Sequence, residues 1–150
     1  MKNKLLIFVL FTVLCSCVST KSTLKNVDEH ALIPKLNSNN VFVLTEYSKD
    51  EKYGYDKDYP INVFYKNAKD ENVNQERYLN ALAGPKGEPI TFKKVETCCP
   101  FPTKSVEMGV GLIDVYEITW AGQKQPIKLH LNYYEKGALM VPMGLTLKKN

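Results

Sequence analysis

The sequence is poor in the side chains that most often bind metals or carry out catalysis. It contains only two histidines, His30 and His130, and their spacing is not that of metal ligands. None of its four cysteines belongs to a pair separated by two residues, which is typical of zinc and thioredoxin-type redox sites. Phosphate-binding loops, hydrolase nucleophile elbows, paired-histidine helices and dinucleotide fingerprints are also absent. The sequence therefore predicts no metal site and no cofactor, and we assign no catalytic residue.

No apolar run is long enough to cross a bilayer, which takes about 20 residues. The longest run, residues 5–14, is interrupted only by Thr12 and follows Lys2 and Lys4. A positive start, a short apolar segment and small residues before a cleavage point are typical of a secretory signal. We therefore expect residues 1–17 to be a signal peptide that is not part of the fold.

The end of this signal resembles the lipobox of bacterial lipoproteins, which is a leucine, two small residues and a cysteine. Leu14 to Cys17 fit it, whereas lipid on Cys15 would place the bulky Leu14 just before the cut. The resemblance implies that Cys17 carries a diacylglyceryl thioether and that its new amine is acylated, for example with palmitate. Several acyl chains, each contributing about 0.8 kcal/mol per buried methylene, anchor a protein where one chain would not. A cleaved signal without lipid is the alternative.

The residue after Cys17 bears on the destination of the protein. In the lipoproteins that the lipobox resembles, an aspartate at this position retains the protein at the inner membrane, but here it is Val18. The acidic cluster that marks surface export in some lineages is also missing. We therefore expect lipid anchoring at the periplasmic face of the outer membrane, with the inner membrane and the cell surface as alternatives.

The charge is too small to indicate a nucleic-acid partner. The formal net charge of +4 falls to about +2 without Lys2 and Lys4, and no basic block is present. The chain after residue 17 is long enough for one domain with its own core, and it contains no internal repeat. Residues 18–40 are rich in serine, threonine, lysine and asparagine and are expected to be a tether. Residues 41–150 are expected to form a single domain.

The pattern of this domain predicts an α+β fold, an antiparallel sheet of about six strands with one helix packed on it. The helix is expected over residues 73–83, where apolar residues recur at helical spacing before Gly84 and Pro85 stop it. The last three strands should form an antiparallel meander, with a hairpin turn at residues 135–137. Alternating apolar and β-branched residues predict strands at residues 41–47, 59–65, 90–96, 112–120, 126–134 and 139–147.

The adjacent Cys98 and Cys99 lie among prolines and are the only cysteines left to pair once Cys17 carries lipid. Export places them in an oxidising compartment. Neighbouring Cα atoms are about 3.8 Å apart, which is less than the roughly 4.4–6.8 Å of ordinary disulfides, so a bond between them would be strained and easily reduced. Three interpretations stay open: a vicinal disulfide that shapes a surface corner, two buried or idle thiols, and a redox or metal site.

Two other groups of residues are candidate sites. Asp114, Glu117 and His130 lie on adjacent predicted strands, where a carboxylate and a histidine can serve acid–base catalysis. The alternative is a solvent-exposed polar pair on the wet face of the sheet. Tyrosine is abundant, and tyrosines suit both strand packing and exposed binding faces. A binding face would consist of Tyr53, Tyr55, Tyr59 and Tyr134.

Four segments of the chain resemble a family of small envelope lipoproteins of Gram-negative bacteria. They are residues 62–67, 82–89, 98–104 and 111–117, and the resemblance covers about residues 41–149. It implies no catalytic residues. Some similar chains bear the label 2-dehydro-3-deoxyphosphooctonate aldolase, but that enzyme is a (β/α)₈ barrel of about 250 residues, which one predicted helix and several hairpins do not provide.

The sequence as a whole predicts a membrane-anchored envelope lipoprotein that presents a small non-catalytic binding domain in the periplasm. Its partners would be the bilayer, through acylated Cys17, and an envelope protein, glycan or lipid. The alternative is a redox or other enzyme that uses Cys98 with Cys99, or Asp114 with His130.

Overall fold

A computed structural model describes residues 21–63 and 72–149. The predicted signal peptide, the lipobox and Cys17 lie outside these residues, as does the end of the strand expected at residues 59–65. Within the described part of the chain, no helix has the length and apolar character that crossing a membrane requires.

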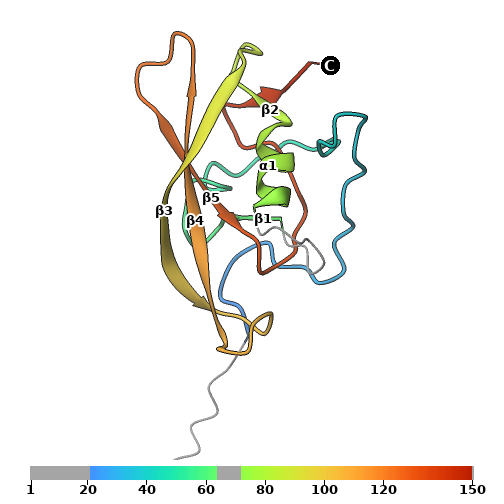
Figure 1. Cartoon of the computed structure of the whole chain (residues 1–150), viewed down its shortest axis with the longest axis vertical. Coiled ribbons are helices and arrows are strands. Elements are labelled where there is room, and N and C mark those ends of the chain that lie inside the picture. Colours follow the sequence, from blue (N-terminus) through green and yellow to red (C-terminus); the bar gives the residue numbers. More distant parts are fainter. Residues whose placement is uncertain (1–20, 64–71, 150) are drawn as a thin grey trace, which may run out of the picture.

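The fold is α+β and is built on a mixed four-stranded sheet in the order β1-β5-β4-β3. β1 runs parallel to β5, and the two other neighbouring pairs are antiparallel. Figure 1 shows β3 and β4 as one long twisted hairpin that runs along most of the length of the molecule. The strands are β1 (Ile61–Asn62), β3 (Ile90–Pro102), β4 (Val110–Trp120) and β5 (Ile127–Asn132).

One short helix and one small sheet cover the inner face of the four-stranded sheet. The helix α1 (Val73–Leu79) packs through Tyr78 and Leu79 into the main core. β2 (Leu82–Ala83) follows the helix directly and pairs antiparallel with β6 (Thr146–Leu147). The sheet contributes fully buried side chains to the same core, including Ile61, Ile118, Leu129 and Leu131.

The expectation of six antiparallel strands is wrong in detail, first at residues 41–47. This segment forms no strand; it makes only single bridges, from Phe42 to Leu36 and from Tyr47 to Val141. Phe42 and Leu44 are buried whereas Val43 and Tyr47 are exposed, so the alternation is real. The segment is extended and packs one side against the core, but it has no partner strand. Alternation of buried and exposed residues indicates burial of one side and does not show that the segment is hydrogen-bonded in a sheet.

The strand expected at residues 139–147 is also wrong. Pro142 and Gly144, which has a φ of 84°, form a turn in which the Leu145 amide donates to the Pro142 carbonyl. Only β6 remains as strand in this part of the chain. Residues 135–137 do not make a hairpin either, since Lys136 bridges to Val63. The antiparallel meander therefore consists of β3, β4 and β5.

The helix is shorter than its sequence pattern predicts. It ends at Leu79 with Asn80 as its C-cap, so Gly84 is not the cap. Gly84 instead opens a tight turn, in which its amide donates to the Glu88 carbonyl and Gly87, with a φ of 87°, donates back to the Gly84 carbonyl. The apolar side chains near residue 82 belong to the strand β2 and not to the helix. Because they also fit helical spacing, the sequence pattern placed the end of the helix too late.

Two buried tyrosines predict a loss of stability in alkali. The Tyr78 hydroxyl donates to the Met140 carbonyl at 2.6 Å, and the Tyr53 hydroxyl accepts from the Met140 amide at 3.1 Å. Burial raises the pKa of both tyrosines above the ordinary value. Unfolded tyrosines ionise near pH 10, so the unfolded state loses protons first and the free energy of unfolding should fall as the pH rises above about 10.

Urea unfolding followed by circular dichroism between pH 8 and pH 11 tests this expectation. The variant with Tyr53→Phe and Tyr78→Phe should show a shallower alkaline decline, although it is less stable at pH 8 because the hydrogen bonds of the two hydroxyls to Met140 and Ala138 are lost. The half-exposed Tyr47 supplies the control Tyr47→Phe, which should decline like the wild type. An equal slope in all three proteins would contradict the argument.

Candidate functional site

A groove of about 580 Å³ lies where the C-terminal segment passes α1 and β2. Three stretches line it, residues 37–44, 80–81 and 147–149, and we call it the distal groove. In Figure 1 these stretches lie in the upper half of the molecule, whereas the described chain begins at the lower end. The volume is within the range of about 300–1,000 Å³ that is usual for small-ligand sites.

The outer rim of the distal groove is a loop held by asparagine side chains. The Asn37 side-chain oxygen accepts the amides of Asn39 at 2.9 Å and Val41 at 3.0 Å. Asn40 has a φ of 61°, a left-handed conformation that asparagine tolerates better than most residues. Arg77 of α1 donates to the Asn40 side-chain oxygen at 3.0 Å. The rim is therefore fixed to the helix before any ligand binds.

Backbone hydrogen bonds fix both walls of the distal groove to the segment that contains the end of α1. On one side, the Phe42 amide donates to the Arg77 carbonyl at 3.3 Å. On the other side, the Lys148 amide donates to the Ala81 carbonyl at 2.9 Å. The groove is thus a product of tertiary structure and not of one loop.

The lining of the distal groove is suited to a polar ligand. Within residues 21–63 and 72–149, the side-chain amides of Asn39 and Asn80 make no hydrogen bond, and Lys148 and Lys149 make no ion pair. Val43 is 46% exposed and adds an aliphatic contact. Amides supply both donors and acceptors, and ammonium groups supply charged donors. The groove can therefore hold a neutral or acidic polar chain.

Cys98 and Cys99 are joined by a disulfide on the edge strand β3. The pairing with β4 shifts between Cys98 and Phe101, so the disulfide lies in a β-bulge, and Cys99 has a φ of 59°. Cys99 packs against a small second core, which contains Leu24, Phe101, Ile113, Val27 and Tyr134. Of the three interpretations, the structure therefore has the vicinal disulfide, which lies within the strand, and not two free thiols. Among the described residues, no group of histidine, cysteine and acidic side chains could hold a metal.

The bulge leads to a prediction about how the disulfide contributes to stability. It joins neighbouring residues and closes almost no loop, so its loss should barely change the entropy of the unfolded chain. The left-handed conformation of Cys99 costs about 1–2 kcal/mol in an L-residue but very little in glycine. Urea unfolding should therefore show the variant with Cys98→Ser and Cys99→Gly to be about 1 kcal/mol more stable than the one with Cys98→Ser and Cys99→Ser. A lower stability for the glycine variant would contradict this view.

The structure separates the predicted catalytic pair. On β4 and β5, Asp114 lies opposite Leu131, and Val115 lies opposite His130. Directly opposed residues share a face of the sheet and successive residues alternate, so Asp114 and His130 point to opposite faces. His130 lines a separate open groove with Tyr55. Asp114 and His130 therefore form neither an acid–base pair nor an exposed pair, whereas Glu117 shares the face of His130 and pairs with Lys93 at 2.9 Å.

Asp114 is the centre of a buried polar network between α1 and the sheet. Its carboxylate accepts hydrogen bonds from Gln75 at 3.0 Å and from Thr97 at 2.7 Å, and it pairs with the Lys94 ammonium at 3.2 Å. The Tyr116 hydroxyl donates to the Gln75 side-chain oxygen at 2.7 Å. Asp114 and Gln75 are almost fully buried. Because these groups satisfy one another, the network fixes α1 on the sheet and leaves no carboxylate free for a substrate.

The four tyrosines do not form one binding face. Tyr53 is fully buried in the main core, with the edge of the half-buried Tyr59 ring 5.4 Å away, centroid to centroid. Tyr55 donates to the Met143 carbonyl at 2.7 Å. Tyr134 lies in the second core, where it stacks on Tyr133. Core packing therefore accounts for Tyr53, which is not available to an exposed binding face.

Comparisons with known proteins leave the chain without a relative that identifies its function. No protein-family model matches it, and no curated protein or solved structure is significantly similar to it. The candidate function must therefore be argued from the residues. Sequence reasoning missed the distal groove, and its only local signal is the run of asparagines near residue 39, which also fits a turn.

Proposed function

We propose that this protein is a lipid-anchored envelope protein whose small domain binds a polar partner in the distal groove without catalysis. The preformed distal groove is the observation that carries the binding part of the proposal. Its amide and lysine side chains stay available for a ligand, and its rim and walls are hydrogen-bonded into the fold.

The anchor is the lipid on Cys17, and the site of action is the periplasmic face of the outer membrane. Support comes from the signal and lipobox pattern of residues 1–17 and from Val18 in place of aspartate. The described chain begins only four residues after Cys17, at the end opposite the distal groove (Figure 1). An anchor there leaves the distal groove open to the periplasm.

The separation of Asp114 from His130 favours binding over acid–base catalysis. The interpretation of the disulfide as a redox centre has less support, because it lies in a bulge of a strand and Cys99 packs against an apolar cluster. The polar lining of the distal groove favours a glycan strand or an acidic peptide segment over an acyl chain.

Intact mass of the protein isolated from its native membrane tests the anchor. The wild type should begin at Cys17 and carry diacylglyceryl and acyl mass. Cys17→Ala should carry no lipid and should leave the membrane fraction, whereas Cys15→Ala should behave like the wild type. An unlipidated wild type, or lipid on the Cys17→Ala protein, would overturn the anchor.

Crosslinking in cells tests the distal groove. A photoreactive amino acid at Val43 should yield a defined adduct with a glycan or a peptide, and Lys148→Ala with Lys149→Ala should reduce its yield. A photoreactive amino acid at the exposed Gln125, in the turn after β4, with Lys124→Ala and Lys128→Ala, is the matched control and should yield no such adduct. Equal adducts at both positions would contradict binding in the groove.

A further inference from the structure

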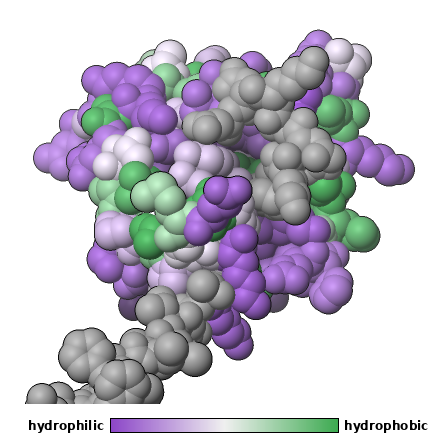
Figure 2. Space-filling view, turned by 60° about the horizontal axis from the view of Figure 1, so that its bottom comes forward, coloured by the Kyte–Doolittle hydropathy of each residue, from purple (hydrophilic) through white to green (hydrophobic). Residues whose placement is uncertain are grey.

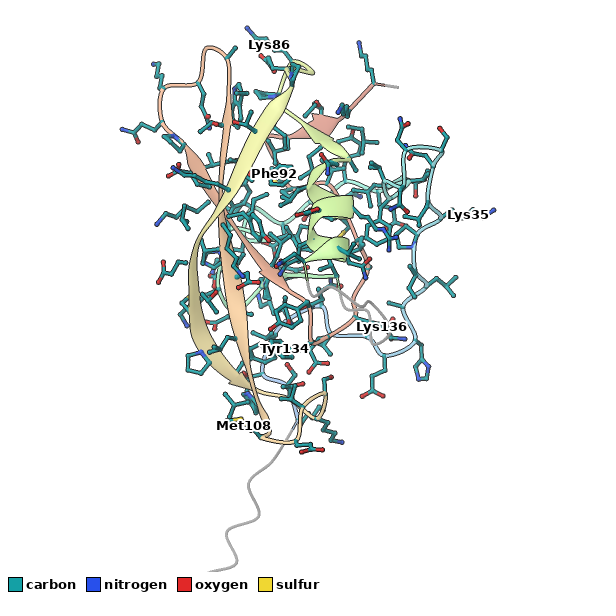
Figure 3. All side chains as sticks on the ribbon, viewed as in Figure 1. Lys35, Lys86, Phe92, Met108, Tyr134 and Lys136 are labelled. Carbon is teal, nitrogen blue, oxygen red and sulfur yellow. A yellow bond between two sulfur atoms is a disulfide. The ribbon has the colours of Figure 1, made fainter. Side chains whose placement is uncertain are left out.

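The turn between β3 and β4 lies at the same end of the molecule as the start of the described chain. Residues 21–24 and this turn, residues 103–109, together form what we call the anchor-side end. The two segments are neighbours, because Lys21 and Lys104 line the same cleft of about 250 Å³ and Leu24 packs against Phe101. Figure 3 shows Met108 at the lower tip of the molecule, in this turn.

The short connection to Cys17 holds the anchor-side end near the membrane. Lys21 comes four positions after Cys17, and an extended chain spans at most about 3.6 Å per residue, so Lys21 lies within about 14 Å of the lipidated cysteine. Leu24 is buried, and the Lys25 amide donates to the Asp58 carbonyl at 2.9 Å. The chain is therefore already fixed to the domain a few residues after the anchor.

The surface of the anchor-side end presents an exposed apolar side chain and carries only a small net charge, +1 from Lys21, Lys104 and Glu107. Met108 is 88% exposed, and Val110 and Leu112 at the start of β4 are 49% and 38% exposed. Figure 2, which brings the lower end forward, shows apolar side chains gathered among hydrophilic ones on this side. Within the turn the charges of Lys104 and Glu107 oppose each other. The surface therefore suits apolar contact better than attraction to an anionic surface.

We propose that the turn between β3 and β4 inserts Met108 into the interface of the bilayer that holds the lipid on Cys17. This inference rests on the anchor of the proposed function. The domain then stands on the membrane at two points, the acylated cysteine and the turn, and the distal groove points away from the bilayer. Phospholipid is the occupant that the position of residue 21 favours, and a protein partner or a second copy of the chain is an outcome of the test.

Because the chain is tethered through Cys17, a weak contact between the turn and the bilayer is sufficient for docking. Burying a methionine side chain contributes only about 1.5–3 kcal/mol, which would not hold a free domain on a membrane. Once the cysteine is anchored, insertion of the turn is an intramolecular step with a high effective concentration. The test must therefore use the full lipidated chain.

The single tryptophan of the chain, Trp120, makes this test direct. It ends β4, about 33 Å along the strand from Val110 at 3.3 Å per residue. The lipidated wild type and Met108→Trp are reconstituted into phosphatidylcholine vesicles with and without brominated acyl chains. Brominated lipid should remove the emission added by Met108→Trp and should leave the emission of the wild type unchanged.

The outcomes separate the failure of docking from the failure of the anchor. If both proteins float with the vesicles but the added emission is not quenched, the docking proposal is wrong and the anchor stands. If the wild type carries no lipid and does not float, both proposals fail. Quenching that requires anionic lipid would overturn apolar insertion and would indicate attraction to headgroups. A blue shift that depends on protein concentration, without quenching, would also overturn it and would indicate contact with a second copy of the chain.

Discussion

Asp114→Ala should lower the free energy of unfolding by about 3 kcal/mol, one of the two largest effects that we expect. The substitution leaves the buried Gln75 amide without its acceptor, and an unpaired buried polar group costs about 1–3 kcal/mol. It also removes the partner of the exposed Thr97 hydroxyl and of the Lys94 ammonium. Because Gln75 belongs to α1, the helix also loses its polar attachment to the sheet. Urea unfolding followed by circular dichroism measures the change.

A surface ion pair on the opposite face of the same strands provides the control. Lys93 and Glu117 pair at 2.9 Å, but the lysine side chain is largely exposed, and exposed pairs contribute about 0–1 kcal/mol. Lys93→Ala should therefore change stability far less than Asp114→Ala. Similar losses in the two variants would mean that the buried network does not hold α1 on the sheet.

The sequence predicted the central sheet well because its strands are half buried. The alternation in residues 126–134 placed Leu129 and Leu131 on the core side and Lys128 on the wet side, and the structure has them there. The hairpin of β3 and β4 was not predicted: its strands were expected separately, at residues 90–96 and 112–120, and β3 continues past residue 96 to Pro102. When one face of a strand packs against the core, apolar and polar residues alternate along it. This alternation can be seen in the sequence without knowing which strand is the partner.

The environment of Asp114 was not predictable in the same way. Near this residue both faces of β4 are covered, because Ile113 and Val115 on the other face are buried too, and Ile113 packs against Leu24 and Phe101. A strand that is buried on both faces shows no alternation, so the sequence gives no sign of which way a carboxylate points. Its partner Gln75 comes from a distant helix.

The distal groove escaped prediction for a related reason. Its three stretches are far apart in the sequence, and each has an ordinary local explanation: a turn near residue 39, a helix end at Asn80 and a lysine-rich C-terminal segment. The pairing of β2 with β6 brings two of them together, and the bonds of Arg77 to Phe42 and Asn40 add the third. Those two strands are so short that hydrophobic period cannot identify them.

Gly137→Ala should destabilise the protein by about 3 kcal/mol, because there is no space for a side chain at this position. A Cβ atom there would collide with the backbone carbonyl oxygen of Asn26. Backbone cannot move aside as a flexible side chain can, and overpacking a well-packed site costs about 1–3 kcal/mol or more. The same carbonyl accepts from the Asn62 side chain at 2.8 Å, and the Asn26 side chain donates to the Ala138 carbonyl at 2.9 Å.

Gly122→Ala is the matched control for this substitution. Gly122 has a φ of 82° but no atom within 4 Å of a new Cβ, so alanine there should cost only the left-handed backbone, about 1 kcal/mol. Urea unfolding of the two variants separates the collision from a general effect of replacing glycine. Equal losses would show that Asn26 yields easily and that residues 24–28 are not a fixed part of the domain.

The same substitution connects stability to orientation at the membrane. If Gly137→Ala moves Asn26, the attachment of residues 24–28 loosens, and the chain between Cys17 and its first fixed contact becomes longer. A longer connection lowers the effective concentration of the turn at the bilayer. We therefore expect Gly137→Ala to weaken the quenching of Met108→Trp by brominated lipid, whereas flotation of the lipidated chain stays unchanged and Gly122→Ala has no effect on either. Undiminished quenching in a destabilised Gly137→Ala protein would show that the turn reaches the bilayer without help from the attached segment.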